Sequence, residues 1–366
     1  MKRVIISVSN DLVSDQRVHK VATSLHNNGY NITLIGRKIS NSLPINREYK
    51  TKRFRLLFKK GPLFYACLNC RLFLFLLFVK ADIFLSNDLD TLLGNYTASK
   101  IRNKKLVYDS HEYFTEVPEL QGRNFIRKRW QGIEKRILPK LKYSYTVCNT
   151  IAEEYKKKYG INMLTIRNIP MLENINVENK KDLLEKIIIY QGALNIGRGI
   201  EEVMKALEYL NNVKFHIIGT GDIEKELKEL AIKLNIANKV RFFGKIPFEE
   251  LKQQTTKADI GISLEQNLGL NYYYSLPNKI FDYIHAEVPI LASKFPEIEK
   301  IVNGFKIGVT IENYEPEYLA KIINDMLFDK GKRKIWQENL KKTSTELNWQ
   351  KEEKVLLKLF ELIEVS

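Results

Sequence analysis

The sequence is poor in cysteine. Only three of its 366 residues are cysteines, Cys67, Cys70 and Cys148, which is too few and too scattered for the disulfide framework of a secreted protein. Cys67 and Cys70 form a C-x-x-C pair, but the pair lies in an apolar helical run without a second pair of metal ligands, so packing explains it better than zinc or redox chemistry. The opening MKRVIISVSN is typical of a buried strand rather than a cleavable signal. We therefore expect a reducing, cytoplasmic setting.

Acidic residues are scarce in the first half of the chain. Residues 1–170 hold 31 Lys and Arg against 13 Asp and Glu, a net charge of +18, whereas residues 171–366 hold 28 against 30, a net charge of −2. A charge so unevenly distributed points to an anionic partner of the first half, either nucleic acid or a negatively charged membrane surface.

The sequence has no comfortable membrane span. Its most apolar run, Leu63 to Val79, covers 17 positions and is interrupted by Asn69 and Arg71, so it is too short and too polar at its centre. Basic residues precede it, at positions 53, 55, 59 and 60, and the combination suits an amphipathic element lying on an anionic leaflet. Apolar residues occupy every face of the run, so a helix of the domain core is an equally open alternative.

A G-x-G-x-x-G motif is missing after the first strand, where SVSNDLVSDQRV stands. The interpretation of the chain as a nicotinamide-dependent dehydrogenase therefore lacks its main sequence signal.

The chain does have a repeated alternation of β-type runs and helical patterns. The strands expected in the first half are VIISV, NITLI, IFLS, KLVYD and YTVC, and those in the second half are KIIIYQ, VKFHIIG, VRFFG, ADIGIS, PILAS and IGVTI. This alternation predicts the α/β class, with two doubly wound Rossmann-like domains facing a cleft.

Ligands of such sheets bind beyond the carboxyl ends of the strands, and three strand-to-helix junctions of the second half carry suitable residues. HIIGTGD places Gly219 and Gly221 where a backbone can approach a ligand closely. NIGRGIEEV places Arg198 where a guanidinium can grip a phosphate. The alternative for Arg198 alone is a solvated surface residue.

The third junction is SLPNKIFDY, in which Pro277 is well placed to start a helix. The free N–H groups of the helix start, Asn278 and the Lys279 ammonium suit an anion. Asp282 lies three residues after Lys279, on the same helix face, where it can accept hydrogen bonds from hydroxyls. These residues suit a nucleotide diphosphate, with Asp282 on the ribose; by itself, Asp282 is explained equally well as a complement to the helix dipole.

The whole chain resembles a GT-B-fold glycosyltransferase of the retaining group called family four, which builds bacterial surface glycans. The residues that carry the resemblance are SNDLVSDQRVHKVA, VYDSHEYF, YQGALNIGRG, IIGTGD and SLPNKIFDYIHAEVPILAS, the last being the most specific. The resemblance implies an N-terminal acceptor-binding domain over residues 1–170, a linker over 171–183 and a C-terminal nucleotide-sugar domain over 184–345. It also implies that the helix over 346–366 packs back on the N-terminal domain.

Some positions depart from the family pattern. The family's arginine and lysine at the start of the second domain correspond here to Ala193 and Arg198, so one phosphate cation is missing. Of the family's two glutamates, the second corresponds to Asp282, whereas the first corresponds to Tyr274. Glu265, at the end of ADIGISLE, is the candidate to supply the lost carboxylate.

The resemblance also indicates residues in the first half. Ser9 and Asn10 stand where the family has a glycine pair, and they are expected to approach the donor diphosphate. His111, after the strand KLVYD, matches a family histidine near the donor sugar, and we expect it to be catalytic together with Arg198 and Lys279. Asp15 and Arg17 are candidates for binding the acceptor or the donor phosphates; alternatively, they cap and decorate the helix after the first strand.

The resemblance implies a retaining, metal-independent hexosyltransferase of polysaccharide biosynthesis. It would move a hexose-type sugar from a nucleotide-diphosphate sugar to a lipid-linked or growing surface glycan, with no cofactor, no metal and no enzymic nucleophile. Its basic half would meet an anionic membrane and not nucleic acid, so we expect a cytoplasmic protein at the inner face of the plasma membrane. The alternatives are a catalytically weak GT-B scaffold, a nucleotide-sugar epimerase and, on net charge alone, a nucleic-acid-binding protein.

Overall fold

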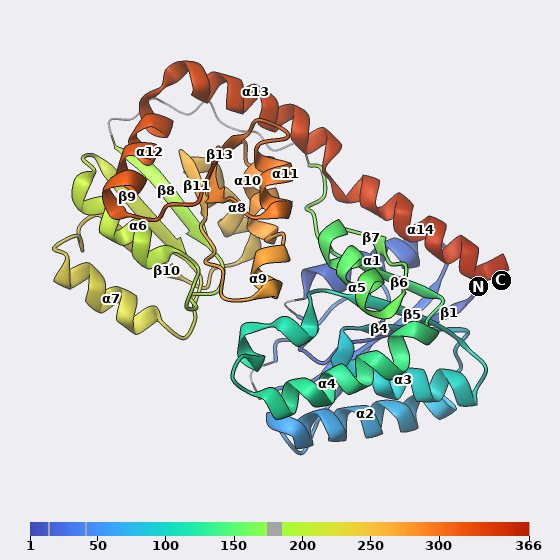
Figure 1. Ribbon diagram of the computed structural model, residues 1–366. Coiled ribbons are helices and arrows are strands. Elements are labelled where there is room, and N and C mark those ends of the chain that lie inside the picture. The colour runs from blue at the N-terminus through green and yellow to red at the C-terminus, as the bar shows by residue number, and fades with distance from the viewer. Residues whose placement is uncertain (14, 41, 174–184, 366) are drawn as a thin grey trace. The chain divides into compact units, whose positions relative to one another are not determined.

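The computed structural model describes residues 1–13, 15–40, 42–173 and 185–365. The chain forms two compact units: Met1–Asn168 together with Glu352–Ser366, and Ile169–Lys351. Each unit contains one sheet in which all ladders are parallel, covered by helices (Figure 1). The predicted class of two Rossmann-like α/β domains is therefore confirmed. The expected linker, 171–183, lies from residue 174 onward outside the described residues.

The first unit has a seven-stranded sheet with the order β3-β2-β1-β4-β5-β6-β7. The central strands β1 and β4 are almost wholly buried, as expected for parallel strands covered on both faces. The strands are β1 (Arg3–Ser7), β2 (Asn31–Arg37), β3 (Lys50–Phe54), β4 (Ile83–Asn87), β5 (Lys105–Ser110), β6 (Tyr143–Thr146) and β7 (Leu164–Thr165).

Two strands of this sheet were not expected from the sequence. β7 is only two residues long, and β3 ends at Phe54, inside the segment expected to lie on a membrane. Arg53 therefore belongs to an edge strand, where its guanidinium donates to the Leu43 carbonyl at 2.8 Å and lies 3.4 Å from an Asp11 carboxylate oxygen. Arg53 is thus held by the unit itself.

The helices of the first unit are α1 (Gln16–Asn27), α2 (Gly61–Phe78), α3 (Leu89–Ile101), α4 (Asn124–Ile137) and α5 (Asn149–Tyr159), and the C-terminal α14 (Trp349–Val365) joins them from Glu352 onward. Short 3₁₀ turns lie at Phe114–Glu116, Pro118–Leu120 and Leu138–Lys140. α14 is fixed by an edge-to-face contact of Phe360 with Tyr30, ring centroids 5.5 Å apart, and by a 2.9 Å ion pair between Arg167 and Glu352.

Helix α2 is the one described helix long and apolar enough to span a membrane by length and composition, but one of its faces is part of the unit's core. Phe64, Leu68, Leu72 and Leu76, each four residues apart, are buried. Asn69, the polar interruption noted in the sequence, donates to the Asp90 carbonyl at 2.7 Å and accepts from a backbone N–H of α3 at 2.9 Å. The core alternative therefore accounts for the inner face of this run, and the expectation that the run lies on a membrane stays a prediction.

The second unit has a six-stranded sheet with the order β10-β9-β8-β11-β12-β13. The strands are β8 (Lys186–Gln191), β9 (Val213–Ile218), β10 (Val240–Gly244), β11 (Ile260–Ser263), β12 (Ile290–Ser293) and β13 (Gly308–Ile311). The helices are α6 (Ile200–Ala206), α7 (Glu224–Lys233), α8 (Phe248–Lys257), α9 (Leu270–Tyr274), α10 (Asn278–His285), α11 (Pro296–Val302), α12 (Pro316–Phe328) and α13 (Lys330–Glu346), and a 3₁₀ turn lies at Leu207–Tyr209.

The strand-end loops of the second unit pack closely on one another, and the packing requires glycine. Gly219 follows β9 with φ 138°, and a Cβ there would lie 1.8 Å from the Gly192 carbonyl oxygen, which follows β8. A Cβ on Gly221 would lie 2.3 Å from the Leu194 carbonyl oxygen. Both glycines were expected to let the backbone approach a ligand; the close approach that the structure shows is to the chain itself.

Candidate functional site

The start of helix α10 gathers the cationic residues predicted for the second unit. Pro277 is the N-cap of the helix and Asn278, its first residue, is exposed. The Lys279 side chain turns inward, with 8% of the residue exposed, and its ammonium lies 2.9 Å from a Glu265 carboxylate oxygen. The ammonium also lies 4.1 Å from the centre of the Tyr190 ring, a cation–π contact.

Arg198 reaches the same place from the loop between β8 and α6. Its nearest guanidinium nitrogen is 3.8 Å from the Glu265 oxygen that Lys279 contacts, and its guanidinium carbon is 4.5 Å from the centre of the Tyr272 ring. The following residue, Gly199, has φ 72°, and a Cβ there would lie 2.2 Å from the Leu264 carbonyl oxygen. The loop can therefore hold Arg198 here only with glycine beside it.

Glu265 joins the two cations. Its side chain is fully buried two residues after the end of β11, and its second carboxylate oxygen accepts from Ser263 at 2.8 Å. Burial disfavours the charged carboxylate, but Lys279 and Arg198 outweigh it and hold the pKa of Glu265 below its usual range. The family resemblance made Glu265 a candidate for binding the donor sugar, which stays a prediction; the structure places its carboxylate between the two cations.

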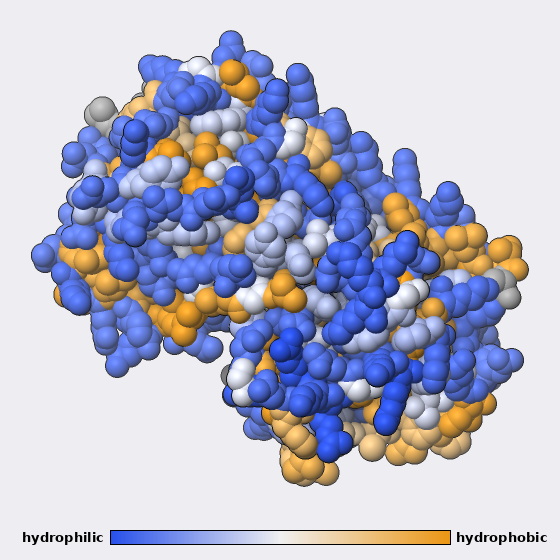
Figure 2. All heavy atoms as spheres, viewed as in Figure 1, coloured by the Kyte–Doolittle hydropathy of each residue, from blue (hydrophilic) through white to orange (hydrophobic). Residues whose placement is uncertain are grey.

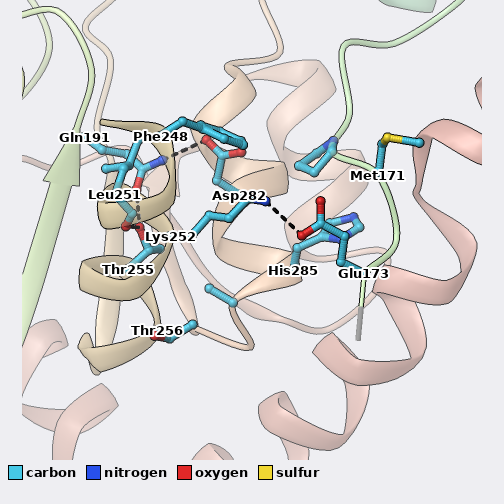
Figure 3. Close-up of a pocket in the computed structure, with 12 residues that line it drawn as sticks. Met171, Glu173, Gln191, Phe248, Leu251, Lys252, Thr255, Thr256, Asp282 and His285 are labelled. Atoms are coloured by element: carbon cyan, nitrogen blue, oxygen red, sulfur yellow. Dashed lines mark hydrogen bonds and ion pairs between the residues drawn. The ribbon is translucent and has the colours of Figure 1, made fainter. Parts of the chain in front are cut away.

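Asp282, one turn after Lys279 on α10, lines a pocket of about 420 Å³, counting its open mouth (Figure 3). Its carboxylate accepts from the Gln191 amide at 2.7 Å, and the Gln191 carbonyl oxygen accepts from Thr255 at 2.8 Å. Gln191 is the last residue of β8, so the chain of hydrogen bonds fixes the carboxylate at a strand end. Phe248 lines the apolar part of the pocket from α8, and its side chain is drawn near Asp282 in Figure 3.

In the first unit, His111 lies directly after β5 between two aspartates. Its Nδ1 is 3.2 Å from Asp88 and its Nε2 is 3.1 Å from both Asp109 and the Asn87 side-chain oxygen. Burial opposes a charge on the ring, but Asp88 and then Asp109 outweigh it and raise the pKa of His111 to about 9. His111 is therefore a cation at neutral pH that donates from both ring nitrogens, and it is not a free base.

Asp88 holds His111 from a strained backbone. Its φ is 56° with ψ 168°, a conformation that residues other than glycine rarely adopt. The same residue accepts from the His111 backbone N–H at 2.8 Å, and its own N–H donates to the Asp109 carbonyl at 2.8 Å. Such strain persists only where surrounding contacts enforce it, and it is found mainly at functional sites.

The two residues expected to bind an acceptor have structural partners in their own unit. Arg17 is buried and donates to both oxygens of Asp109, at 3.0 and 2.7 Å, and to the Ile166 carbonyl at 2.9 Å. Asp15 caps α1 by accepting from the Val18 N–H at 3.0 Å, and it also accepts from the exposed Asn10 amide at 2.8 Å. Asp15 therefore caps the first helix, as the alternative had it, whereas Arg17 is buried and joins that helix to β5; the acceptor role of the pair stays a prediction.

Sequence reasoning missed Asp88, Asp109 and Gln191. Each is a polar residue at or directly after the end of a strand that was expected, and that position was the available signal. Ser9, expected to approach a diphosphate, lies half-buried just after β1. Within the described residues, no group of three or more His, Cys, Asp and Glu is placed to hold a metal ion.

Comparison with known proteins adds an independent finding. A family model described as "Glycosyl transferases group 1" matches residues 172–343, and one described as "Glycosyltransferase Family 4" matches residues 15–170. Two uncharacterized glycosyltransferases of Methanocaldococcus jannaschii are each 25% identical to this chain, over 190 and 289 residues. These alignments cover 50% and 74% of this chain, and 46% and 72% of the two relatives.

Two solved structures share the fold over the whole chain. A sucrose-phosphate synthase from Thermosynechococcus elongatus has a TM-score of 0.82 at 16% identity, with 100% of both chains covered. The Anabaena protein HepE, in complex with UDP-glucose, has a TM-score of 0.76 at 14% identity, with 99% of this chain and 100% of HepE covered. At these identities the likeness is one of fold.

Proposed function

The chain belongs to the family-four glycosyltransferases of GT-B fold, and we propose from that membership that it moves a hexose-type sugar from a nucleotide-diphosphate sugar to a lipid-linked or growing surface glycan. The observation that carries the proposal is the meeting of Lys279 and Arg198 on Glu265 at the start of α10, one helical turn from the Asp282 pocket. Two cations that can bind phosphates, with a carboxylate that can accept hydrogen bonds from ribose hydroxyls one helical turn away, suit a nucleoside diphosphate.

The donor would occupy the second unit in a defined order. The diphosphate would lie at Lys279, Arg198 and the free N–H groups of the α10 start, where the helix dipole favours an anion. The ribose hydroxyls would donate to Asp282, which Gln191 already fixes at 2.7 Å. The base would lie against the apolar wall that includes Phe248. HepE, whose fold is shared, was solved with UDP-glucose.

The reaction follows from where charge develops. When the bond between sugar and phosphate breaks, its electron pair leaves with the diphosphate, and the two cations stabilise that charge. The acceptor oxygen bonds to the sugar carbon on the face that the phosphate leaves, so the anomeric configuration is retained. The acceptor proton passes to the departing phosphate oxygen, and no enzymic nucleophile is required.

His111 would act in this scheme as a fixed cation or hydrogen-bond donor. Both of its ring nitrogens face carboxylates, so accepting a proton from a substrate would first require it to lose one. Because Lys279 and Arg198 already provide the positive charge that a metal would bring to a diphosphate, we propose that transfer is metal-independent.

The location proposed for the protein is the cytoplasmic face of the plasma membrane, as a peripheral protein. The support is the net charge of +18 over residues 1–170, which suits a leaflet of anionic lipid, and a lipid-linked acceptor would be presented there.

A catalytically weak scaffold is the second candidate, and Glu265 is the observation that favours it. Tyr274 stands where the family has its first glutamate, and the carboxylate that was the candidate replacement is held by Lys279 and Arg198. A scaffold would bind nucleotide sugars without consuming them.

A panel of nucleotide sugars tests the proposal. The purified protein is incubated with each sugar, with and without membrane lipid extract, and released nucleoside diphosphate is measured. Consumption of at least one donor, with NMR showing the donor's anomeric configuration in the product, is expected. Binding without consumption would favour the scaffold. If the protein neither binds nor consumes any donor of the panel, the proposal is refuted.

A further inference from the structure

Helix α4 carries a cationic stripe that the sequence reading did not single out. Phe125, Lys128, Arg129, Lys135 and Arg136 are all exposed and recur at spacings of three, four and seven residues, so they share one face of the helix. None of the four cations is paired with a carboxylate in the described part of the chain. The Arg129 guanidinium carbon lies 4.8 Å from the centre of the Phe125 ring, which is 70% exposed.

The opposite face of α4 holds the helix on the unit. Arg127 donates to the Thr115 carbonyl at 3.0 Å and pairs with Glu116, while Glu134 is fully buried and accepts from Tyr159 at 2.6 Å. The helix therefore has a fixed orientation, and within the described residues of the first unit no carboxylate pairs with its charged stripe.

Helix α2 presents an uncharged stripe to solvent. Leu63, Cys67, Cys70, Leu74 and Phe78 recur at spacings of four, three, four and four residues, which places them on one face. Leu63, Leu74 and Phe78 are 59%, 56% and 83% exposed. Exposed large apolar side chains in a continuous row are unusual on a monomeric soluble protein and mark an interaction site.

Helices α2 and α4, which carry the two stripes, are neighbours in the first unit. Figure 1 shows α2, α3 and α4 running side by side, and the Trp130 ring of α4 meets the Tyr65 ring of α2 edge to face, centroids 5.1 Å apart. Figure 2 shows the result on the surface, where a hydrophobic band over α2 lies beside strongly hydrophilic side chains.

We propose that α2 and α4 together form the docking face for an anionic lipid leaflet, with the α4 cations at the headgroups and Leu63, Leu74, Phe78 and Phe125 entering the acyl boundary. An apolar row flanked by Lys and Arg is the pattern of a surface that lies in the membrane interface. The face lies in the interface without crossing the bilayer, because Asn69 and the inner stripe of α2 remain bound to the unit.

The inference rests on the proposed membrane location and adds the α4 cations to those expected from the sequence. Of the four expected residues, Arg53 is held by Asp11 and the Leu43 carbonyl, whereas Arg55, Lys59 and Lys60 are exposed just before α2. Nucleic acid is a poorer match than lipid, because phosphate contacts give no role to a row of exposed leucine and phenylalanine.

Vesicle co-sedimentation tests the proposal with the full-length protein. Partition is measured on phosphatidylglycerol–phosphatidylcholine vesicles and on phosphatidylcholine alone, at low and high salt. The charge variant is K128Q/R129Q/K135Q/R136Q, and its matched control is K332Q/K334Q/K341Q/K342Q on α13, which removes the same charge from exposed positions of the second unit. The apolar variant is L63Q/L74Q/F78Q, matched by I232Q/F328Q/I335Q at exposed positions of the second unit.

We expect the wild type and both controls to bind the anionic vesicles and to lose binding as salt rises. The charge variant should partition at least about tenfold more weakly, because each lost cation near an anionic surface weakens attachment. The apolar variant should show a similar loss. Equal partition of a variant and its control, or wild-type binding to an oligonucleotide but not to vesicles, would overturn the proposal.

Donor consumption without lipid, measured on the same variants, separates this inference from the proposed function. The four α4 positions and the three α2 positions lie outside the predicted donor site, so consumption of a nucleotide sugar is expected to be unchanged in all variants. Donor consumption without vesicle binding would refute the docking face alone, whereas vesicle binding without any donor consumption would refute the transferase activity alone.

Discussion

Replacing Asp88 by asparagine should lower the pKa of His111 and weaken the first unit. The substitution removes the carboxylate 3.2 Å from Nδ1 and keeps a side chain of the same shape. Asparagine tolerates a positive φ about as well as aspartate does, so the strained backbone is preserved. A single charge is therefore the main change in the site.

The magnitude follows from the pKa. A rise of the His111 pKa from 6.5 to about 9 corresponds to about 3 kcal/mol of favourable interaction with the protonated ring. Asp88 and Asp109 share this stabilisation, and Asp88 is the larger contributor. Asp88→Asn should therefore reduce the free energy of unfolding at neutral pH by less than about 2 kcal/mol, because burial also raises the pKa of Asp88 itself and the variant removes the cost of that buried charge.

The stability difference between wild type and Asp88→Asn should depend on pH. Because the folded pKa of His111 is raised, its stabilisation is fully present below the unfolded value of 6.5 and disappears as pH rises through about 9. The stability difference between wild type and Asp88→Asn should therefore be largest near pH 6 and smallest near pH 10. Histidine NMR titration measures the pKa directly, and urea unfolding at the two pH values measures the difference. A His111 pKa that does not fall in the variant, or a stability loss independent of pH, would refute this reasoning.

Three further predictions concern the second unit. Arg198→Ala and Lys279→Ala should each cost about 2 kcal/mol or more in kcat/KM for donor consumption in folded protein, because each removes a cation from the diphosphate; near-normal turnover of both variants would contradict their assignment. Activity should survive EDTA, and loss that magnesium or manganese restores would show that a metal holds the diphosphate. Gly219→Ala should lower the melting temperature of the second unit, because its Cβ would lie 1.8 Å from the Gly192 carbonyl oxygen; an unchanged melting temperature would show that these strand-end loops can separate.

The sequence was sufficient for the features that depend on local pattern. The central strands are apolar runs bounded by helical spacing, so their number and their division into two series could be predicted. Pro277, Lys279 and Asp282 could be found because they share one short motif at a helix start. Edge strands β3 and β7 were missed, since β3 is polar along most of its length and β7 has only two residues.

The partners of the candidate residues could not be predicted, because they come from distant parts of the chain. Arg17 contacts Asp109, which is 92 positions away, and nothing local marks the pair as buried. Glu265 contacts Lys279, 14 positions away, and Arg198, and no local pattern pairs the three residues. The strain at Asp88 is enforced by contacts with β5 and His111. The local sequence around β4 therefore does not predict the positive φ of this residue.

A crystal structure with a bound nucleoside diphosphate, such as UDP, tests the central claim most directly. The account predicts phosphate oxygens within hydrogen-bond distance of Lys279, Arg198 or the first N–H groups of α10, and ribose hydroxyls on Asp282. A nucleotide bound in the second unit away from Arg198, Lys279 and Asp282, or bound only to the first unit, would contradict it.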